Sequence, residues 1–463
     1  MKKIIYALFL LTSFPIFAQQ FWCTAPPRDY AWTYVGNAGF SAGEAKYTSI
    51  AFSPSGSPFI AFLDMANSAK VTVMKFNGND WIIVGSAGFS AGYAGWINLA
   101  FNYADSLPYV AYEDGGNDSK ATVMKFDGTN WVNVGAAGFS AGWSGYISLA
   151  FSPSCEPYVA FTDYANSQKA TVMKFDGANW MIVGYAGFSA GKTAYTSLAF
   201  DTSGQPYVAF KDWAQGQKTT VMTFDDGNHW GNVGGAGFSA GWVNYTRIAF
   251  SPFGEPYVAY VDNLNDGKVT VKKFNGTQWV NVGNAGFSAG QSWYINIVFS
   301  PSGEPYVAFA DGNLYAAAAS VMKFNGTNWI YVGNANFSPA VVDYTSLAFS
   351  ASGDPYVAYC DWANSQKVTV MKFDSVYLGI KIANQSALSI YPNPVSRILT
   401  IDIKNLPDQV KYLEITDAKG KNIYTVQTAD NKINLNVEEY PTGIYFVKLK
   451  TNKSNFIQKF CKH

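Results

Sequence analysis

Tryptophan recurs along this chain with a spacing of 49 or 50 residues. The seven copies are Trp32, Trp81, Trp131, Trp180, Trp230, Trp279 and Trp329. An aspartate keeps the same period, at Asp64, Asp114, Asp163, Asp212, Asp262, Asp311 and Asp361. A fixed period of this length is typical of proteins built from repeated structural units. Residues that recur in every unit are first assigned to the fold, so function is to be sought where the units differ.

One unit, residues 146–184, contains four short apolar runs separated by turn residues. The runs predict strands at Ile147–Ser152, Tyr158–Asp163, Ala170–Phe175 and Trp180–Val183. Four strands in a unit of about 50 residues predict the blades of a β-propeller rather than helical repeats. Successive side chains of a strand point to opposite faces of the sheet. We therefore expect Val159 and Phe161 to face one neighbouring blade, and Tyr158 and Ala160 to face the other.

The phase of the repeat predicts how the ring closes. The first element is a lone outer strand at Ala31–Gly36, and the last unit, residues 344–373, supplies three strands. The segment that follows it, "DSVYLGI", lacks the tryptophan of an outer strand. We therefore predict an all-β fold with a seven-bladed propeller over residues 31–374, whose last blade is completed by the N-terminal strand. The succession "LAFSPSG", "PYVAF-D" and "VMKFDG" resembles the NHL-type propeller repeat in layout. No function is inferred from that resemblance.

The N-terminus predicts export. Residues 1–18 have the form of a secretory signal peptide, with Lys2 and Lys3, an apolar run at Ile4–Leu11, and Ala18 as the predicted cleavage point. Residues 19–30 would form an N-terminal segment. No longer apolar run follows, so we expect no transmembrane segment. Aromatic residues make up 17% of the chain and charged residues 14%, which suits a β-rich extracellular protein.

The charge distribution and the cysteine spacing limit which binding partners and metal sites the sequence predicts. Residues 19–374 contain 18 Lys and Arg against 25 Asp and Glu, and residues 375–463 contain 12 against 7. Neither balance predicts a nucleic-acid-binding surface. The four cysteines, Cys23, Cys155, Cys360 and Cys461, show no paired spacing, so no zinc site or disulfide scaffold is predicted. We expect no cofactor, although calcium on Asp and Asn loops stays open.

After a linker at residues 375–387, residues 388–463 lose the repeat and alternate apolar and polar residues between turns, which predicts a small antiparallel β-sandwich. This segment resembles the C-terminal sorting domain of the type IX secretion system of Bacteroidota. The resemblance is carried by Tyr391-Pro392-Asn393-Pro394, Leu399 with Ile401, Asp417 with Gly420, and Pro441-Thr442-Gly443-Ile444-Tyr445. It implies that the type IX machinery is a partner and that the protein is released or displayed on the cell surface.

The sequence "GFSAG" matches the G-x-S-x-G turn that presents the nucleophile of many hydrolases. It occurs complete at Gly39, Gly88, Gly138, Gly187, Gly237 and Gly286. That chemistry needs a histidine base and a following helix, yet His229 is the only histidine before the C-terminal tail. We interpret the motif as a glycine-rich connection between blades.

The turn at residues 126–131, "FDGTNW", is similar to the Asp-box of sialidases, but the glycine and tryptophan lie one residue nearer the aspartate. Sialidases use three arginines to hold the substrate carboxylate, whereas the propeller segment contains only Arg247, with Arg28 just before it. Sialidase activity is therefore not predicted. The turn is better explained as a hairpin that places a buried tryptophan on the outer strand.

The repeated aspartate permits two interpretations. It is followed six residues later by lysine in six units, as in Asp163 and Lys169, which predicts an ion pair at a hairpin mouth. Alternatively, aspartates such as Asp114, Asp163 and Asp262 accept hydrogen bonds from a ligand that stacks on aromatic rings, as sugars do. The rings for that site are Tyr47, Trp96, Tyr146, Tyr195, Tyr245, Tyr294 and Tyr344.

Residues that vary between units indicate specificity more directly. Tyr93, Trp143, Lys192, Trp242 and Trp293 are predicted to crowd the same loop face. We therefore predict a secreted or surface-displayed propeller that binds a ligand without catalysis, most plausibly a glycan. The alternatives are a glycoside hydrolase or lyase that uses two carboxylates, for which Glu113 beside Asp114 is a candidate, and a protein-binding adhesin or scaffold.

Overall fold

The computed structural model describes residues 28–225, 229–313, 316–377, 388–403, 411–450 and 455–463. The predicted signal peptide with Ala18, and most of the predicted 19–30 and 375–387 segments, lie outside the described residues. The described chain divides into a larger unit at Tyr30–Asp374 and a second unit that contains the C-terminal strands. Each unit is described by itself below.

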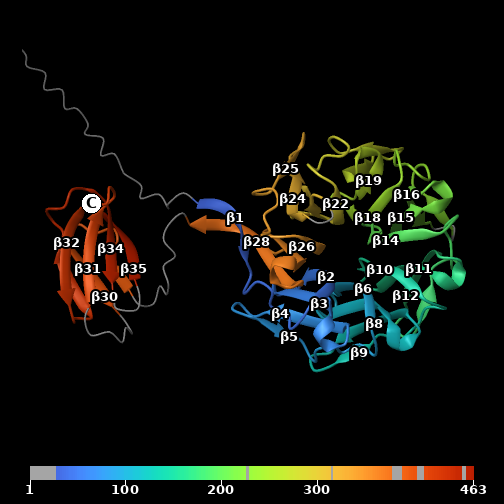
Figure 1. The fold of residues 1–463 in the computed structure, drawn as a ribbon, viewed down its shortest axis with the longest axis horizontal. Coiled ribbons are helices and arrows are strands. Elements are labelled where there is room, and N and C mark those ends of the chain that lie inside the picture. The colour runs from blue at the N-terminus through green and yellow to red at the C-terminus, as the bar shows by residue number, and fades with distance from the viewer. Residues whose placement is uncertain (1–27, 226–228, 314–315, 378–387, 404–410, 451–454) are drawn as a thin grey trace, which may run out of the picture. The chain divides into compact units, whose positions relative to one another are not determined.

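The larger unit consists of seven four-stranded antiparallel sheets arranged around a common centre (Figure 1). The innermost strands are β2 (Ala45–Phe52), β6 (Ala94–Phe101), β10 (Ser144–Phe151), β14 (Thr193–Phe200), β18 (Val243–Phe250), β22 (Ser292–Phe299) and β26 (Val342–Phe349). The second strands are β3 (Pro58–Asp64), β7 (Pro108–Asp114), β11 (Pro157–Asp163), β15 (Pro206–Asp212), β19 (Pro256–Asp262), β23 (Pro305–Asp311) and β27 (Pro355–Asp361).

The third strands are β4 (Lys70–Phe76), β8 (Lys120–Phe126), β12 (Lys169–Phe175), β16 (Lys218–Phe224), β20 (Lys268–Phe274), β24 (Ala318–Phe324) and β28 (Lys367–Tyr377). The outer strands are β5 (Trp81–Ile83), β9 (Trp131–Asn133), β13 (Trp180–Ile182), β17 (Trp230–Asn232), β21 (Trp279–Asn281), β25 (Trp329–Tyr331) and β1 (Arg28–Tyr34). Blades are numbered from the sheet β2-β3-β4-β5. Short 3-10 helices follow six of the second strands: η1 (Met65–Asn67), η2 (Gly115–Asn117), η3 (Tyr164–Asn166), η4 (Trp213–Gln215), η5 (Asn263–Asn265) and η6 (Trp362–Asn364).

The predicted alternation is confirmed by the packing between blades. Val159 and Phe161 belong to the apolar cluster that joins blades 2 and 3, whereas Tyr158 and Ala160 belong to the cluster that joins blades 3 and 4. Equivalent clusters join every adjacent pair of blades, and one of them unites residues of β27 and β28 with residues of β2, β3 and β4. The core of the unit is therefore distributed around the ring rather than gathered in one place.

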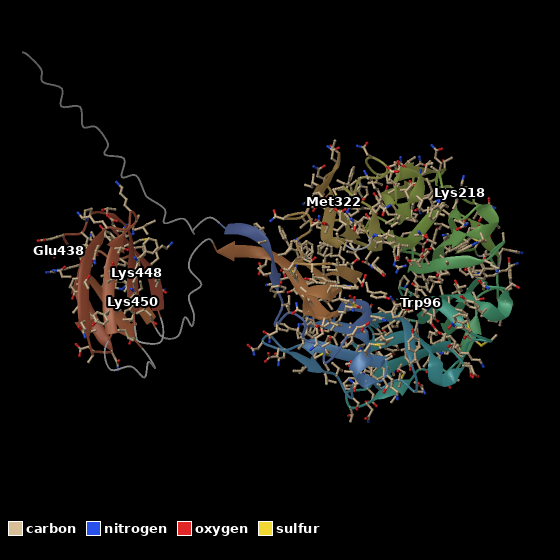
Figure 2. All side chains as sticks on the ribbon, viewed as in Figure 1. Trp96, Lys218, Met322, Glu438, Lys448 and Lys450 are labelled. Carbon is tan, nitrogen blue, oxygen red and sulfur yellow. The ribbon has the colours of Figure 1, made fainter. Side chains whose placement is uncertain are left out.

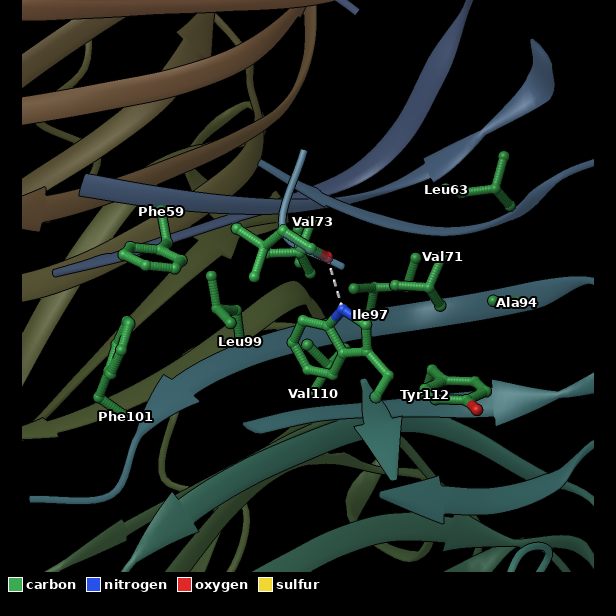
Figure 3. Packing of buried hydrophobic residues seen from close by; sticks show 13 residues of the cluster. Phe59, Leu63, Val71, Val73, Ala94, Ile97, Leu99, Phe101, Val110 and Tyr112 are labelled. Carbon is green, nitrogen blue, oxygen red and sulfur yellow. Dashed lines mark hydrogen bonds between the residues drawn. The ribbon is translucent and has the colours of Figure 1, made fainter. Parts of the chain in front are cut away.

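The repeated tryptophan anchors each blade to the one before it. Its indole Nε1 donates a hydrogen bond of 2.7–2.9 Å to the carbonyl of a valine at the end of the preceding outer strand, as in Trp131 to Val84. Its ring also stacks on the phenylalanine of the preceding "GFSAG" segment, with centroids 4.3 Å apart for Phe89 and Trp131. Figure 3 shows the cluster between blades 1 and 2, where the dashed line marks the Trp131 bond.

Blade 7 is assembled from two distant parts of the chain. Its strand order is β26-β27-β28-β1, so the strand at Arg28–Tyr34 lies beside β28 (Figure 1). The backbone N–H of Val35 donates to the Val370 carbonyl at 2.9 Å, and Trp32 Nε1 donates to the Val332 carbonyl at 2.7 Å. Strand β28 continues to Tyr377, three residues into the segment predicted as a linker.

The C-terminal unit contains two antiparallel sheets, as the alternation in its sequence predicts. One has the order β29-β30-β33 and the other β32-β31-β34-β35. Their bounds are β29 (Leu388–Tyr391), β30 (Ile398–Ile403), β31 (Lys411–Asp417), β32 (Asn422–Thr428), β33 (Lys432–Asn436), β34 (Gly443–Lys450) and β35 (Asn455–Lys462). Side chains of both sheets, among them Leu399, Ile401, Ile415 and Val447, form a single apolar core, which defines a β-sandwich.

The described cysteines are in different states. Cys155 and Cys360 are free thiols, and Cys360 is buried. Cys461 is disulfide-bonded, which the scattered spacing of the cysteines did not predict.

Candidate functional site

The loop face of the propeller is built by two kinds of connection that contact each other. One leads from the second to the third strand of a blade and contains the 3-10 helix, and the other is the "GFSAG" segment that leads into the next blade. In blade 3 the backbone N–H of Tyr164 donates to the carbonyl of Trp143 at 3.0 Å, and the other blades repeat this bond. Side chains at the starts of the innermost strands therefore lie next to side chains of the 3-10 helices.

The repeated aspartates are buried inside this framework. Asp163 is 1% exposed, and its carboxylate accepts hydrogen bonds from Ala165 N (3.1 Å), Asn166 Nδ2 (2.8 Å) and Thr171 Oγ1 (2.8 Å). Asp114 and Asp262 have the same three kinds of partner. These carboxylates cap the 3-10 helices and fix the third strands. Their acceptor capacity is used within the chain, which favours the structural interpretation of the aspartate ring.

The predicted ion pair between these aspartates and the following lysines is wrong. Asp163 and Lys169 are cross-strand partners in register, yet no salt bridge joins such a pair among the residues that the structure describes. The physical reason is burial: the carboxylate turns toward the backbone amide, the amide side chain and the hydroxyl inside the blade, while Lys169 remains half-exposed. Fixed donors in the interior hold a carboxylate more strongly than a solvated ammonium does.

The serines of the "GFSAG" segments are structural. Ser140 is 3% exposed, donates to the Gly142 carbonyl at 2.7 Å and accepts from Ala121 N at 2.9 Å. Gly138 has φ of +60°, and a Cβ placed there would lie 2.9 Å from Cβ of Asn117, so the position requires glycine. The geometry confirms the interpretation of this motif as a connection between blades.

Seven aromatic side chains form a closed collar around the central channel. Each ring contacts both of its neighbours, with centroids 4.2–5.3 Å apart around the circle Tyr47, Trp96, Tyr146, Tyr195, Tyr245, Tyr294 and Tyr344. Figure 2 shows Trp96 near the middle of the ring of blades. All seven residues have φ between 50° and 55°, a left-handed conformation that is unfavourable for an aromatic residue. A bulge at this point of each innermost strand produces it and turns the ring inward.

The collar bounds a central cavity of about 320 Å³. Below the collar, each innermost strand places a second residue on the channel: Ser49, Asn98, Ser148, Ser197, Arg247, Asn296 and Ser346. Burial raises the pKa of the collar hydroxyls, to about 12 for Tyr146, so they are neutral hydrogen-bonding groups at physiological pH. The sequence predicted these rings as stacking surfaces for a ligand, but much of their surface is used in contacts with one another.

Exposed aromatic side chains gather on the loop face instead. Tyr93, Trp143 and Trp242 are 47%, 45% and 49% exposed, and Lys192 is also exposed. Two further tryptophans lie at the first positions of 3-10 helices, Trp213 at 42% and Trp362 at 51% exposed. Trp293 was predicted to share this surface, but it differs from the other tryptophans because it is half-buried beside Tyr245. In blade 6 the repeat position of Trp242 is held by Gln291.

Blades 4 and 5 form the most developed of these sites. Lys211 is only 6% exposed, and its Nζ lies 5.0 Å from the centroid of the Trp213 ring and 5.2 Å from that of Trp242. The same Nζ donates to Asn244 Oδ1 at 3.1 Å. Burial lowers the pKa of Lys211, since the charged form is poorly solvated between the two indoles. The arrangement presents two partly exposed indole rings around a cation that has donor capacity left.

A related arrangement lies between blades 2 and 3. The rings of Trp143 and Tyr164 stack with centroids 3.8 Å apart. Glu113 of blade 2 is 8% exposed, and hydrogen bonding from the Ser119 and Trp143 side chains favours its charged form. Burial raises the pKa of Glu113 more than these hydrogen bonds lower it. An aromatic platform beside a polar group is again the result.

Blade 7 contributes a carboxylate near the collar. Asp343 Oδ2 accepts a 2.6 Å hydrogen bond from Trp362 Nε1, and interaction with the Tyr294 side chain also favours the charged form of this carboxylate. Burial raises the pKa of Asp343, and the nearby Lys46 partly offsets the effect. Groups of three or more His, Cys, Asp or Glu side chains able to hold a metal ion are not found in the described part of the chain.

Sequence reasoning missed Lys211, Trp213 and Asp343. A signal was available, because aligning the units by their aspartates shows that the preceding residue varies: Leu63, Glu113, Thr162, Lys211, Val261, Ala310 and Cys360. Only three of these residues are polar, and two of the three lie beside the exposed aromatic pairs. The residue after the aspartate varies in the same way and supplies Tyr164, Trp213 and Trp362.

The sorting motif occupies one edge of the sandwich. Asn393 Oδ1 accepts from Cys461 N at 2.9 Å and Asn393 Nδ2 donates to the Lys459 carbonyl at 3.1 Å, which ties the Tyr391-Pro392-Asn393-Pro394 segment to β35. Gly443 begins β34, and the hydroxyl of the buried Tyr445 donates to the Pro441 carbonyl at 2.8 Å. The motif residues therefore stabilise the sandwich that they identify.

Comparison with known proteins agrees with both units. Residues 389–463 match the family model described as "Secretion system C-terminal sorting domain". No curated protein matches the chain. Among solved structures, the chain is similar to the BP39L lectin from Burkholderia pseudomallei, with 15% identity, a TM-score of 0.53, and coverage of 73% of this chain and 100% of the lectin. A polysaccharide lyase of family PL25, an ulvan lyase, has 11% identity, a TM-score of 0.50, and coverage of 74% and 95%.

These comparisons define the class: an all-β protein of propeller blades followed by a type IX sorting domain. At such low identity the two structures establish the fold alone. The sorting domain indicates export through the type IX system, so the protein is secreted or displayed at the cell surface. None of the helices in the described part of the chain has the length and apolar character needed to cross a bilayer.

Proposed function

We propose that the loop face of this propeller binds a glycan without catalysis. The observation that carries the proposal is the pair Trp213 and Trp242, two exposed indoles on neighbouring blades with the buried Lys211 between them. Sugar rings offer C–H faces that pack on indoles, while their hydroxyls and acidic groups hydrogen-bond to fixed polar side chains. Packing does not require these tryptophans, because their repeat positions hold other residue types in other blades.

The chemistry of the site favours an acidic sugar. Lys211 donates to Asn244 and retains further N–H donors, and no salt bridge involves it among the described residues. A carboxylate or sulfate group on the sugar would give this desolvated cation the counter-charge that it lacks. The Trp143–Tyr164 pair beside Glu113 supplies a second platform, suited to a neutral sugar because its polar group is a carboxyl. Two platforms on one face allow a polysaccharide to bind at more than one point.

A lectin and a polysaccharide lyase both have folds similar to this one, so a catalytic alternative has a basis. Apart from the repeated aspartates, the loop face contains the buried Glu113 and the half-buried Asp343, and desolvation raises the pKa of each. Carboxylate-based cleavage needs two acids in contrasting environments, one held protonated and one ionised. Since both shifts have the same direction, these residues favour binding over cleavage.

Glycan arrays and calorimetric titration test the proposal. The protein should bind acidic oligosaccharides, and Trp242→Ala should weaken binding about tenfold, since loss of a stacking ring costs at least about 1.4 kcal/mol. Phe253→Ala is the matched control, because Phe253 is 80% exposed on the turn between β18 and β19 and lies outside the loop face. Release of new chain ends from a bound polysaccharide, abolished by Glu113→Gln, would support the catalytic alternative instead.

A further inference from the structure

A ring of hydrogen bonds runs around the central channel beneath the aromatic collar, and it is interrupted at two adjacent blade junctions. In five of the seven blade junctions, the side chain below the collar accepts a hydrogen bond of 3.0–3.1 Å from a backbone N–H of the next innermost strand. These bonds are Leu99 N to Ser49, Leu149 N to Asn98, Leu198 N to Ser148, Ile248 N to Ser197 and Ile50 N to Ser346. The two junctions without this bond are those that follow Arg247 and Asn296.

Arg247 stands where four other blades have serine, and it changes the chemistry of the channel. A guanidinium has five N–H donors and no acceptor, so it cannot receive the N–H of Ile297 as the serines receive theirs. Within the described residues, its Nη1 donates a hydrogen bond to the Thr246 carbonyl at 3.1 Å. No carboxylate lines the cavity, and no salt bridge involves Arg247 among the residues described.

Neighbouring polar atoms at this junction also lack partners. Thr246 is fully buried and its Oγ1 has no hydrogen bond within the described chain, whereas Thr48, Thr196 and Thr345 donate to collar carbonyls at the equivalent position. On the next innermost strand, the Asn296 Oδ1 atom is buried and unpartnered as well. Asn296 can present its NH₂ group by a half-turn of the amide. The region therefore holds unsatisfied polar groups beside one cation.

We propose that Arg247 binds a small free oxyanion, such as a carboxylate, sulfate or phosphate, in the central channel below the aromatic collar. Two parallel N–H groups of a guanidinium match two oxygens of such an ion, which makes arginine better suited than lysine to this role. The anion supplies acceptors for the guanidinium and for the neighbouring hydroxyl and amide. It also offsets the desolvation that lowers the pKa of Arg247. The site is separate from the tryptophans of the loop face.

The test compares the full exported protein with its Arg247→Ser variant. Serine is chosen because four other blades have it at this position. Titration calorimetry and thermal unfolding are measured with sodium acetate and with sodium sulfate at constant ionic strength, with sodium chloride as the reference salt. The wild type should bind at least one oxyanion and gain Tm with its concentration, and Arg247→Ser should lose at least tenfold in affinity. Without the anion, Arg247→Ser should be as stable as the wild type or more so, because serine restores an acceptor for Ile297 N.

Two results overturn the proposal. One is an equal Tm gain in wild type and Arg247→Ser, which identifies a general salt effect rather than a site. The other is a loss of acidic-glycan affinity in Arg247→Ser with no binding of the free ions, which assigns Arg247 to the glycan. Lys75→Ser, which removes one positive charge from the third strand of blade 1, controls for net charge and should respond to the oxyanion as the wild type does.

Discussion

Trp32 and Val332 are 300 residues apart, and a 2.7 Å hydrogen bond from the indole Nε1 to the valine carbonyl joins them. The same bond links each of the other six repeated tryptophans to the preceding blade, so this one makes the N-terminal strand equivalent to an ordinary outer strand. Its ring also stacks on Phe337, with centroids 4.2 Å apart. The tryptophans are therefore anchors between blades, and the first of them connects the two ends of the propeller.

Replacing Trp32 tests the energetic weight of this connection. Trp32→Phe should lower the free energy of unfolding by about 1–3 kcal/mol, because it leaves the Val332 carbonyl without its partner. Trp131→Phe removes the same bond, to Val84, within continuous chain and is the matched control. Urea denaturation measures both. An unchanged stability in Trp32→Phe beside a loss in Trp131→Phe would mean that the N-terminal strand contributes little to the ring.

The serine of the "GFSAG" segment can be tested as a structural residue. Ser140→Ala removes the bonds to Ala121 N and the Gly142 carbonyl inside the blade. We expect a loss of about 1–3 kcal/mol in unfolding free energy and unchanged glycan affinity in the folded protein. Chemical denaturation and titration on the same preparation measure the two effects. A nucleophilic role would instead appear as labelling of Ser140 by a fluorophosphonate probe.

The buried aspartates should affect stability but not binding. Asp163→Asn replaces an acceptor of three hydrogen bonds with an amide whose NH₂ group faces other donors. The expected cost is about 2–3 kcal/mol. Below the unfolding transition, the affinity for an acidic oligosaccharide should equal that of the wild type. A fall in affinity without a fall in stability would contradict this prediction and would indicate that Asp163 contacts the glycan.

Lys211 predicts a dependence of stability on pH. Its pKa is lowered in the folded protein relative to the ordinary value of 10.5, so between these two pKa values the unfolded chain binds more protons. Stability from this group therefore rises as the pH increases through that interval. Lys211→Met should lack the rise and should be more stable than the wild type at neutral pH. Tm measured from pH 7 to pH 10.5 checks this, with the exposed Lys192→Met as a control that follows the wild type.

The sequence predicted the blades because their determinants are local and repeated. The second strand of the unit is predicted at Tyr158–Asp163 and is found at Pro157–Asp163, since alternation and flanking turns mark its ends. The innermost strand was placed at Ile147–Ser152 but begins at Ser144. The reason is the bulge at Tyr146, whose left-handed backbone interrupts the alternation on which the prediction depended.

The site was harder to predict because it depends on neighbours in space. Trp143 and Trp242 were recognised as variable aromatic residues, and the structure finds both exposed on the loop face. The variable position before the aspartate marks Lys211, but its partners Trp242 and Asn244 lie on the next blade, so only the fold reveals the site. The repeated aspartates have the chemistry of ligand-binding residues, and the sequence alone therefore allows that role. Only the fold reveals that the Asp163 carboxylate already accepts hydrogen bonds from Thr171 and Asn166.

The central claim is that the aromatic residues of the loop face bind a glycan, and one titration tests it most directly. An oligosaccharide containing a carboxylate or sulfate is titrated into the wild type, Trp242→Ala and Phe253→Ala. We predict binding to the wild type and to Phe253→Ala with equal affinity, and about tenfold weaker binding to Trp242→Ala. Equal affinity in all three proteins, or binding lost in Phe253→Ala alone, would contradict the account.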